Sequence, residues 1–270
     1  MEGIENARFE AIELLGCAGV DRTKLYTEPI SIRDLLPEVR QRAAELLGRR
    51  VNGEPLQYII GEWEFYGLPF KVGEGVLIPR QDTETLVEMA LDFLKTRPPE
   101  QRRTLDLCAG TGCIGITLAK LANSDVSCVE FSGAAFGYLA ENVWLNDVEE
   151  RVKPIYGDIF DSEIRRGLGE FDLIISNPPY LTDLDMRNLQ TEVTHEPKMA
   201  LYGGSDGLDF YWSIVCEYTA SVKTGGAIFF EVGAGQAAEV ARILSESGFE
   251  TSIVKDLCKI ERVVCGIKSP

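Results

Sequence analysis

The chain has 270 residues, of which 45% are hydrophobic and 26% are charged, a composition typical of an ordinary globular protein. Its formal net charge of −16 argues against unaided binding to free nucleic acid, because neutralising phosphates requires clustered lysine and arginine. No segment approaches the ~20 apolar residues of a membrane span, and the start of the chain lacks the basic head and apolar block of a signal peptide. We therefore expect a cytoplasmic protein without a membrane anchor.

The cysteines argue against a structural metal site or a disulfide framework. There are seven of them, an odd number, with no Cys-x-x-Cys pair, and the chain contains a single histidine, His195. We expect most of these cysteines to be small buried residues in a reducing compartment, and we predict no metal ligands.

The first 75 residues are predicted to form a small helical domain that ends in a hairpin linker. Apolar residues recur at helical spacing near the start, and residues 37–52 read as a further helix with proline in its first turn and Gly53 beyond its end. Over residues 57–80, aromatic and β-branched side chains alternate with glycine turns, which is typical of a hairpin. We therefore divide the chain into domains 1–75 and 76–270.

The second domain shows alternating helix and strand patterns. Its first helix starts at Asp82 or Thr83, either of which could cap it. From residue 103 onward, short apolar strands alternate with helices of about ten residues, which predicts a doubly wound, mainly parallel α/β sheet of Rossmann-like type. Only a short turn separates the last two strands, so we expect a hairpin at the sheet edge and an antiparallel final strand. The expected strands are 104–108, 126–131, 152–158, 171–176, 226–232, 251–256 and 262–268.

A glycine-rich turn connects the first of these strands to its helix. In LDLCAGTGCIG, Gly110, Gly112 and Gly115 satisfy G-x-G-x-x-G, where glycine permits a tight turn and the close approach of a ligand. Glu130 ends the second strand about twenty residues later, where a carboxylate can accept hydrogen bonds from both ribose hydroxyls. The pair favours a ribose-bearing cofactor, either a nicotinamide dinucleotide or S-adenosylmethionine.

The third strand supplies another acid to the same edge of the sheet. Asp158 could accept a hydrogen bond from an adenine amino group while Ile159 packs on the ring, although Asp158 could equally be a helix cap. Three successive strand ends would then surround one nucleoside. A dinucleotide would place its pyrophosphate at the start of the first helix, whereas S-adenosylmethionine would place its amino-acid end on the glycine loop.

The fourth strand ends in the tetrapeptide Asn177-Pro178-Pro179-Tyr180. Two prolines fix φ and remove two backbone donors, which leaves a rigid acceptor surface. The Asn177 side-chain oxygen and the Pro178 carbonyl could each accept a hydrogen bond from a planar NH2 group, on which Tyr180 would stack. Such a nitrogen is a weak nucleophile, but alignment with a sulfonium methyl at ~3 to 3.5 Å gives a near-attack geometry without a strong base. A plain Pro-Pro turn is the alternative.

Three longer segments, together with the tetrapeptide, resemble the release factor glutamine N5-methyltransferases (PrmC/HemK). They are GEPLQYIIGEWEFYGLPFKVGEGVLIPRQDTE, HEPKMALYGGSDGLDFY and VKDLCKIERVV. The resemblance spans nearly the whole chain. It implies methyl transfer from S-adenosylmethionine to the side-chain amide of the glutamine in the Gly-Gly-Gln motif of class 1 peptide chain release factors. It also implies that the N-terminal domain helps to dock the factor.

The strand ends and the resemblance together select the candidate site residues. We predict cofactor contacts from Cys108, Ala109, Gly110, Thr111, Gly112, Glu130, Asp158, Ile159 and Asn177. We predict substrate contacts from Asn177, Pro178, Pro179 and Tyr180, with Asn177, Pro178 and Tyr180 as the catalytic residues. Four positions depart from the usual family pattern. Cys108 and Ala109 replace glycine and a small hydroxyl residue, Glu130 replaces aspartate, and Ile159 stands where many members have tryptophan.

Other functions remain open at this point. A DNA or RNA amino-group methyltransferase, acting on adenine N6 or guanine N2, shares the tetrapeptide but would need a basic groove, which the net charge disfavours. A nicotinamide oxidoreductase would use the glycine loop but gives the tetrapeptide no role. A homologue that only binds is the third alternative, given the departures at positions 108, 109 and 159.

Two further residues have open roles. Arg80 could pair with a carboxylate near the cofactor or the docked substrate, or form a structural ion pair with Asp82 or Glu84. His195 lies in a family segment where aromatic residues also occur, so we favour a packing or loop-anchoring role over catalysis.

Overall fold

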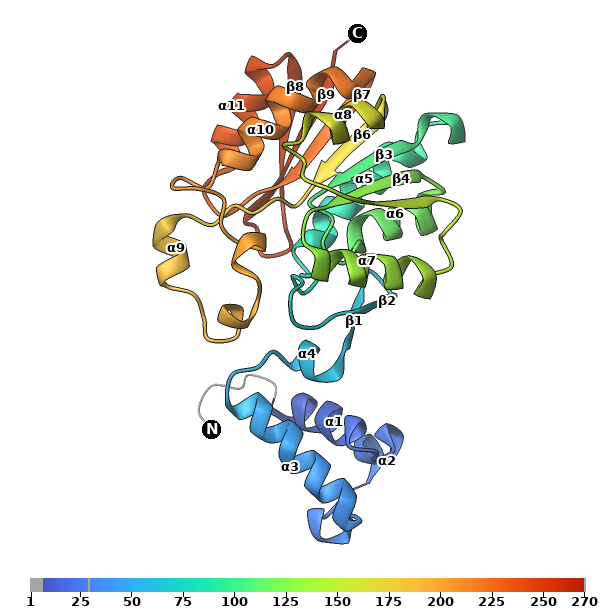
Figure 1. Cartoon of the computed structure of the whole chain (residues 1–270), viewed down its shortest axis with the longest axis vertical. Coiled ribbons are helices and arrows are strands. Elements are labelled where there is room, and N and C mark those ends of the chain that lie inside the picture. The colour runs from blue at the N-terminus through green and yellow to red at the C-terminus, as the bar shows by residue number, and fades with distance from the viewer. Residues whose placement is uncertain (1–6, 29, 270) are drawn as a thin grey trace.

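The computed structural model describes residues 7–28 and 30–269. Figure 1 shows a helical unit, coloured blue, that is joined through a short hairpin to a larger unit containing the sheet. The outermost residues of the two predicted domains, 1–6 and 270, lie outside the described residues. None of the described helices is long and apolar enough to cross a membrane.

The helical unit buries a small apolar core of its own. Its helices are α1 (Ala7–Cys17), α2 (Arg22–Thr27), α3 (Pro37–Val51) and α4 (Leu56–Ile60). Leu14, Leu46 and Ile59, from three of these helices, pack together. Pro37 occupies the first turn of α3, as the sequence predicts, because an N–H at that position would have no partner within the helix.

The hairpin after the helical unit is shorter than the sequence predicts. Residues 57–60 belong to α4, which Gly61 ends at a left-handed φ of 80°, so a hairpin starting at residue 57 is wrong. Its strands are β1 (Glu62–Phe65) and β2 (Leu68–Lys71), which pair antiparallel. Phe65 and Phe70 are buried in the core of the larger unit, and this burial fixes the hairpin to that unit.

The larger unit is built on a seven-stranded sheet with the order β5-β4-β3-β6-β7-β9-β8. Neighbours among β3 to β7 pair parallel, whereas β9 lies antiparallel between β7 and β8, which confirms the predicted antiparallel final strand. The strands are β3 (Arg103–Leu107), β4 (Asp125–Glu130), β5 (Val152–Tyr156), β6 (Phe171–Ser176), β7 (Val222–Glu231), β8 (Phe249–Lys255) and β9 (Glu261–Lys268). The order reverses between β3 and β6, the kind of switch point at which open sheets bind ligands.

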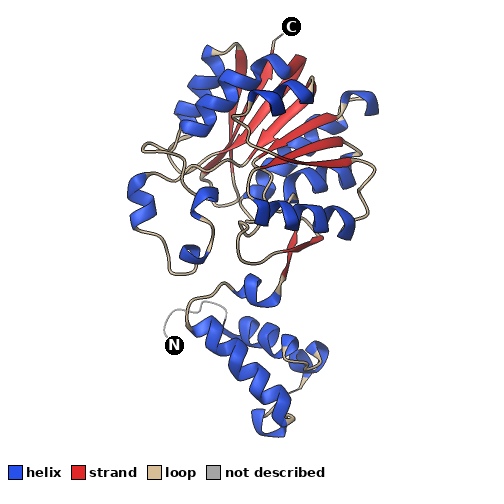
Figure 2. Ribbon diagram, in the orientation of Figure 1, coloured by secondary structure: helices blue, strands red, loops and turns tan. Residues whose placement is uncertain are grey.

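Helices cover both faces of the sheet (Figure 2). The central strand β6 is therefore apolar on both sides, with Leu173 and Ile175 in one core and Ile174 in the other. The helices of this unit are α5 (Thr83–Lys95), α6 (Cys113–Ala122), α7 (Gly133–Leu145), α8 (Ser162–Leu168), α9 (Asp183–Arg187), α10 (Asp209–Tyr218) and α11 (Ala237–Glu246). The doubly wound α/β fold predicted from the sequence is confirmed.

A long loop after β6, residues 181–204, contacts both units. Its Glu192 pairs with Arg50 of α3 at 2.6 Å, and Arg50 also pairs with α1 of the helical unit. Its Glu196 is buried and pairs with Arg80 at the exit of the hairpin. The short helix α9 lies within this loop, and the separate helix α10 follows it.

Candidate active site

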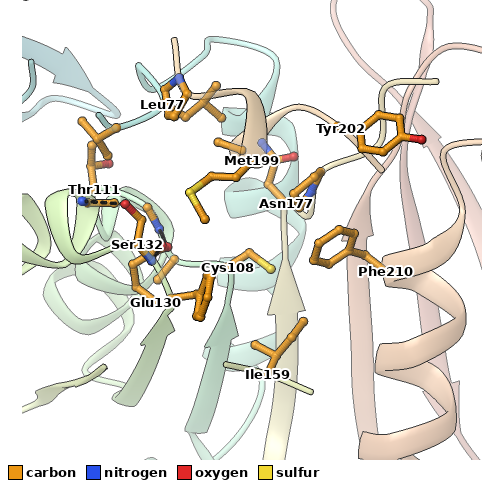
Figure 3. Close-up of a pocket in the computed structure, with 18 of the residues that line it drawn as sticks. Leu77, Cys108, Thr111, Glu130, Ser132, Ile159, Asn177, Met199, Tyr202 and Phe210 are labelled. Carbon is orange, nitrogen blue, oxygen red and sulfur yellow. Dashed lines mark hydrogen bonds between the residues drawn. The ribbon is translucent and has the colours of Figure 1, made fainter. Parts of the chain in front are cut away.

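A cavity of about 640 Å³ lies where the carboxyl ends of β3, β4 and β6 meet, which is within the ~300 to 1,000 Å³ typical of ligand pockets. Figure 3 shows Cys108, Glu130 and Asn177, from these three strand ends, around the same hollow. Met199 and Tyr202 of loop 181–204 line it as well. The fold therefore brings the predicted strand-end residues together in one place.

The glycine-rich loop after β3 wraps one end of the cavity. Cys108, Gly110 and Gly112 adopt left-handed φ angles of 60°, 56° and 80°, so the backbone turns sharply before α6 begins. A Cβ atom on Gly112 would lie 2.4 Å from the Leu139 side chain, so this position needs glycine for packing against α7 rather than for lining the cavity. The loop residues that line the cavity are Cys108, Ala109, Gly110 and Thr111.

The carboxylate of Glu130 joins the loops that follow β3 and β4. Its Oε2 accepts a hydrogen bond from the Gly110 N–H at 2.8 Å, and its Oε1 accepts one from the Ser132 N–H at 2.7 Å. Burial raises the pKa of Glu130 above its ordinary value, although the backbone donors oppose this shift. Each oxygen keeps a further lone pair, so Glu130 can still accept hydrogen bonds from a ligand.

Asp158 and Ile159 follow β5 and line the same cavity. Asp158 Oδ1 accepts a hydrogen bond from the Phe160 N–H at 2.9 Å, which closes a local turn. The role of helix cap belongs instead to Asp161, whose side chain accepts from the first turn of α8. The remaining lone pairs of Asp158 are thus available to a ligand that packs on Ile159.

The tetrapeptide of residues 177–180 continues from the central strand β6. Asn177 Nδ2 donates a hydrogen bond to Thr83 Oγ1 at 3.2 Å, so the amide oxygen is the acceptor that Asn177 can offer to the cavity. Pro179 also lines the cavity, whereas Pro178 and Tyr180 are not among the described residues that do so. Tyr180 packs against the apolar core. The contacts of Pro178 and Tyr180 with a substrate therefore stay predictions.

Loop 181–204 packs directly on the backbone of this tetrapeptide. The two ends of the loop are joined next to the tetrapeptide, because the Leu181 N–H donates to the Leu201 carbonyl at 2.8 Å and the Gly203 N–H donates to the Leu181 carbonyl at 2.9 Å. A Cβ atom on Gly203 would lie 2.5 Å from the Pro179 carbonyl oxygen and 2.6 Å from the Tyr180 Cα. Because residue 203 has no side chain, the end of the loop can lie directly against the backbone of the tetrapeptide.

Replacing Gly203 with alanine should lower the free energy of unfolding by ~1 to 3 kcal/mol, because the added methyl meets backbone atoms that cannot rotate away. We also expect kcat to fall, since the tetrapeptide must shift. Thermal and urea unfolding would measure the first effect. Gly137→Ala is the matched control, because its Cβ meets no atom within 4 Å and alanine favours a helix by ~1 kcal/mol over glycine. Equal stability of Gly203→Ala and the wild type would contradict the expectation.

The structure resolves the open roles of Arg80 and His195 in part. Arg80 pairs with Glu196, which also accepts a hydrogen bond from the Ile78 N–H at 3.1 Å, so the proposed ion pairs with Asp82 or Glu84 are wrong. These two acids are engaged by Arg262 and by the Tyr66 N–H, respectively. His195 is exposed, lies beside Gly53 of the helical unit and is not among the described residues that line the cavity.

Two residues near the site are missed by the sequence reasoning. Thr83 is considered there only as a helix cap, yet its hydroxyl is the partner of Asn177. Glu231 ends β7 as Glu130 ends β4, and it accepts a hydrogen bond from the Tyr180 hydroxyl at 3.5 Å. Glu231, like Glu130, is an acidic residue at the carboxyl end of a predicted strand, and this sequence signal could have identified it.

The lining of the cavity fits S-adenosylmethionine better than a dinucleotide. Glu130, Asp158 and Asp209 bring negative charge, which suits a sulfonium and opposes a pyrophosphate. Among the described residues that line the cavity, the positively charged ones are Lys198 and Arg80, and Arg80 is already paired with Glu196. Within residues 7–28 and 30–269, no group of three or more His, Cys, Asp or Glu side chains could hold a metal ion.

Comparisons with protein families match two parts of the chain. Residues 1–61 match the family described as PrmC N-terminal domain, and residues 82–205 match the family described as methyltransferase small domain.

Whole-chain comparisons agree with these matches. A release factor glutamine methyltransferase of Geobacter sulfurreducens is 42% identical over 269 residues, covering 98% of this chain and 91% of the relative. One from Thermodesulfovibrio yellowstonii is 40% identical over 253 residues, covering 93% of this chain and 88% of the relative. A crystal structure of a methyltransferase from Pyrococcus furiosus is 18% identical, with a TM-score of 0.55 over 85% of this chain and 98% of that one, which shows the shared fold.

Proposed function

We propose that this chain, which belongs to the family of release factor glutamine methyltransferases, transfers a methyl group from S-adenosylmethionine to the Gly-Gly-Gln glutamine of class 1 peptide chain release factors. The acceptor atom is the side-chain amide nitrogen of that glutamine. The observation that supports an amide nitrogen as the methyl acceptor is the orientation of the Asn177 side chain, which lines the cavity. Its Nδ2 donates a hydrogen bond to Thr83, so its oxygen is free to accept one from an NH2 group.

The cofactor would be held by the strand-end residues. Glu130 would accept from the ribose hydroxyls, Asp158 from the adenine amino group, and Ile159 and Cys108 would pack against the adenine ring. The backbone of the glycine loop would bind the amino-acid end. When bound, S-adenosylmethionine supplies an electrophilic methyl group on a positively charged sulfur.

The tetrapeptide would prepare the glutamine amide for attack. The Asn177 oxygen and the Pro178 carbonyl each accept one N–H of the substrate amide, and Tyr180 supports its plane. These hydrogen bonds would orient the nitrogen and bias its lone pair out of conjugation, toward the methyl group that the bound cofactor would supply. Once methylated, the nitrogen would lose one of its protons to solvent, so no strong base is needed.

We further propose that residues 1–75 form a domain that docks the release factor, and residues 76–270 the catalytic domain. In support, the helical unit has a separate core and reaches loop 181–204 through the Arg50–Glu192 pair, so a protein bound there would lie next to the cavity. A free nucleic acid is not the proposed substrate, since the net charge of −16 would repel it. The proposed compartment is the cytoplasm.

The test is incubation of the enzyme with methyl-labelled cofactor and a purified class 1 release factor. We expect label on the Gly-Gly-Gln glutamine and none on a factor whose motif glutamine is replaced by glutamate. DNA and RNA, offered in parallel, should stay unlabelled. Absence of label on the factor, or equal labelling of nucleic acid, would overturn the proposal.

A further inference from the structure

The turn between β7 and α11 brings a glutamine to the end of the tetrapeptide. The turn has the sequence Val-Gly-Ala-Gly-Gln over residues 232–236, and Gln236 directly precedes the first residue of α11. Because β6 and β7 pair parallel, the tetrapeptide and this turn leave neighbouring strands at the same edge of the sheet. Gln236 is not among the described residues that line the cavity, and the mechanism above gives it no role.

Each polar atom of the Gln236 amide has a partner on the backbone. Its Nε2 donates to the Tyr180 carbonyl at 2.9 Å and to the Gly207 carbonyl at 3.4 Å. Its Oε1 accepts from the Gly233 N–H at 2.9 Å. A primary amide has two N–H donors and one acceptor oxygen, so these partners fit only one orientation of the amide. The side chain therefore joins three segments: the tetrapeptide, the residues before α10 and the turn after β7.

Two glycines let the backbone close around this contact. A Cβ atom on Gly207 would lie 2.2 Å from the Tyr180 carbonyl oxygen and 2.4 Å from Gln236 Nε2. A Cβ atom on Gly233 would lie 2.7 Å from Gln236 Oε1 and 3.0 Å from the Tyr180 ring. Within residues 7–28 and 30–269, the Tyr180 carbonyl accepts a hydrogen bond from Gln236 and from no other group. The position of this carbonyl thus depends on one side chain.

A fixed Tyr180 carbonyl restricts the whole tetrapeptide. The rings of Pro178 and Pro179 hold φ at roughly −65°, so few backbone rotations remain between Asn177 and Tyr180. At its first residue the segment continues from β6, which pairs with β3 and β7. At its last residue, Gln236 holds the carbonyl. The Pro178 carbonyl, which the proposed mechanism uses as an acceptor, is therefore oriented from both ends.

We propose that Gln236 is a positioning residue that holds the Tyr180 carbonyl and thereby orients the acceptors of the tetrapeptide toward the substrate amide. The inference rests on the proposed role of the tetrapeptide in holding the glutamine of the release factor. Gln236 acts through the backbone, since it does not line the cavity.

The contact with the tetrapeptide can be separated from a local role of Gln236 in α11. Its Oε1 accepts from the N–H of the residue three positions earlier, as Glu or Gln does in a capping box. Gln236→Glu keeps this acceptor and adds a negative charge that the start of a helix favours. It also replaces the donor that faces the Tyr180 carbonyl with a second acceptor. Gln236→Glu therefore keeps the local contact and removes the contact with the tetrapeptide.

The experiment compares Gln236→Glu with Gln236→Met, which removes both contacts. At saturating cofactor and release factor, kcat should fall about tenfold in Gln236→Met and at least as much in Gln236→Glu, because the lost hydrogen bond orients groups that act in the transition state. KM for the release factor should change less than kcat, and the cofactor Kd should stay within about twofold. The melting temperature should follow the opposite order and be lower in Gln236→Met than in Gln236→Glu.

Two variants away from the tetrapeptide supply the controls. Val152→Ala tests whether lost stability alone lowers turnover, because Val152 is buried at the amino end of β5, at the edge of the sheet opposite the cavity. It should lower the melting temperature and keep kcat within about twofold. Gln101→Glu makes the same chemical change as Gln236→Glu at an exposed position before β3 and should leave both quantities unchanged.

A wild-type kcat in Gln236→Glu would overturn the inference, because Gln236 would then serve only the start of α11. An equal loss of kcat in Val152→Ala would overturn it as well, since the loss would then follow stability. Asn177→Ala, assayed alongside, keeps the proposed function apart from the inference. Full activity of Asn177→Ala would remove the holding role of the tetrapeptide, whereas an inactive Asn177→Ala with a fully active Gln236→Glu would remove only the role of Gln236.

Discussion

Replacement of Asn177 with alanine is expected to lower kcat by ~100-fold or more, because hydrogen bonds that orient the reacting nitrogen act chiefly in the transition state. The alanine variant loses the acceptor in the cavity and also leaves Thr83 without its donor. The Kd for S-adenosylmethionine should change little, since the proposed ribose and adenine contacts come from other strands. Single-turnover kinetics with the release factor, together with calorimetry of the cofactor, would measure the two quantities separately.

Asn188→Ala is the matched control for this variant. Asn188 is an exposed asparagine of loop 181–204, and its side chain donates a hydrogen bond to the carbonyl of Leu184 within α9. It should keep wild-type turnover within about twofold, as surface changes usually do. Weaker cofactor binding by Asn177→Ala with unchanged turnover at saturation would contradict the role of Asn177 in holding the substrate.

The regular part of the fold could be predicted because its local pattern is strong. The helix expected after the glycine turn is α6 (residues 113–122), where an apolar run starts directly after that turn. Strand β6 is buried along its whole length, and its apolar residues Leu173, Ile174 and Ile175 are consecutive, as in a strand that is covered on both faces. Helices α4 and α8 are not predicted, because five and seven residues are too few for a helical period to stand out.

The candidate site could be predicted where its residues sit at strand ends, and not where it depends on contacts distant in the sequence. Glu130 and Asn177 are found because carboxyl ends of parallel strands share one edge of the sheet. The partner of Arg80 is Glu196, which is 116 positions away, and nothing local distinguishes it from Asp82. The need for glycine at position 203 likewise arises from the backbone of Pro179 and Tyr180, which only the folded chain brings close.

Replacement of Glu130 with glutamine is expected to weaken the binding of S-adenosylmethionine by about 10- to 100-fold, the usual effect of losing hydrogen bonds to a charged acceptor. Glutamine has one acceptor oxygen, so it cannot serve both the Gly110 and the Ser132 N–H groups while also accepting from a ribose. The glycine loop should therefore loosen as well, which we expect to appear as a lower melting temperature without cofactor.

Turnover at saturating cofactor should change little in Glu130→Gln, because Glu130 is not proposed to contact the glutamine amide. Calorimetry and kcat at high cofactor concentration would separate the two effects. Glu141→Gln, at an exposed position of α7, makes the same chemical change away from the cavity and should bind the cofactor normally. Glu130→Gln should thus alter Kd and spare kcat, the reverse of Asn177→Ala. If both variants changed Kd and kcat in the same way, the assignment of cofactor binding to Glu130 and of substrate orientation to Asn177 would be wrong.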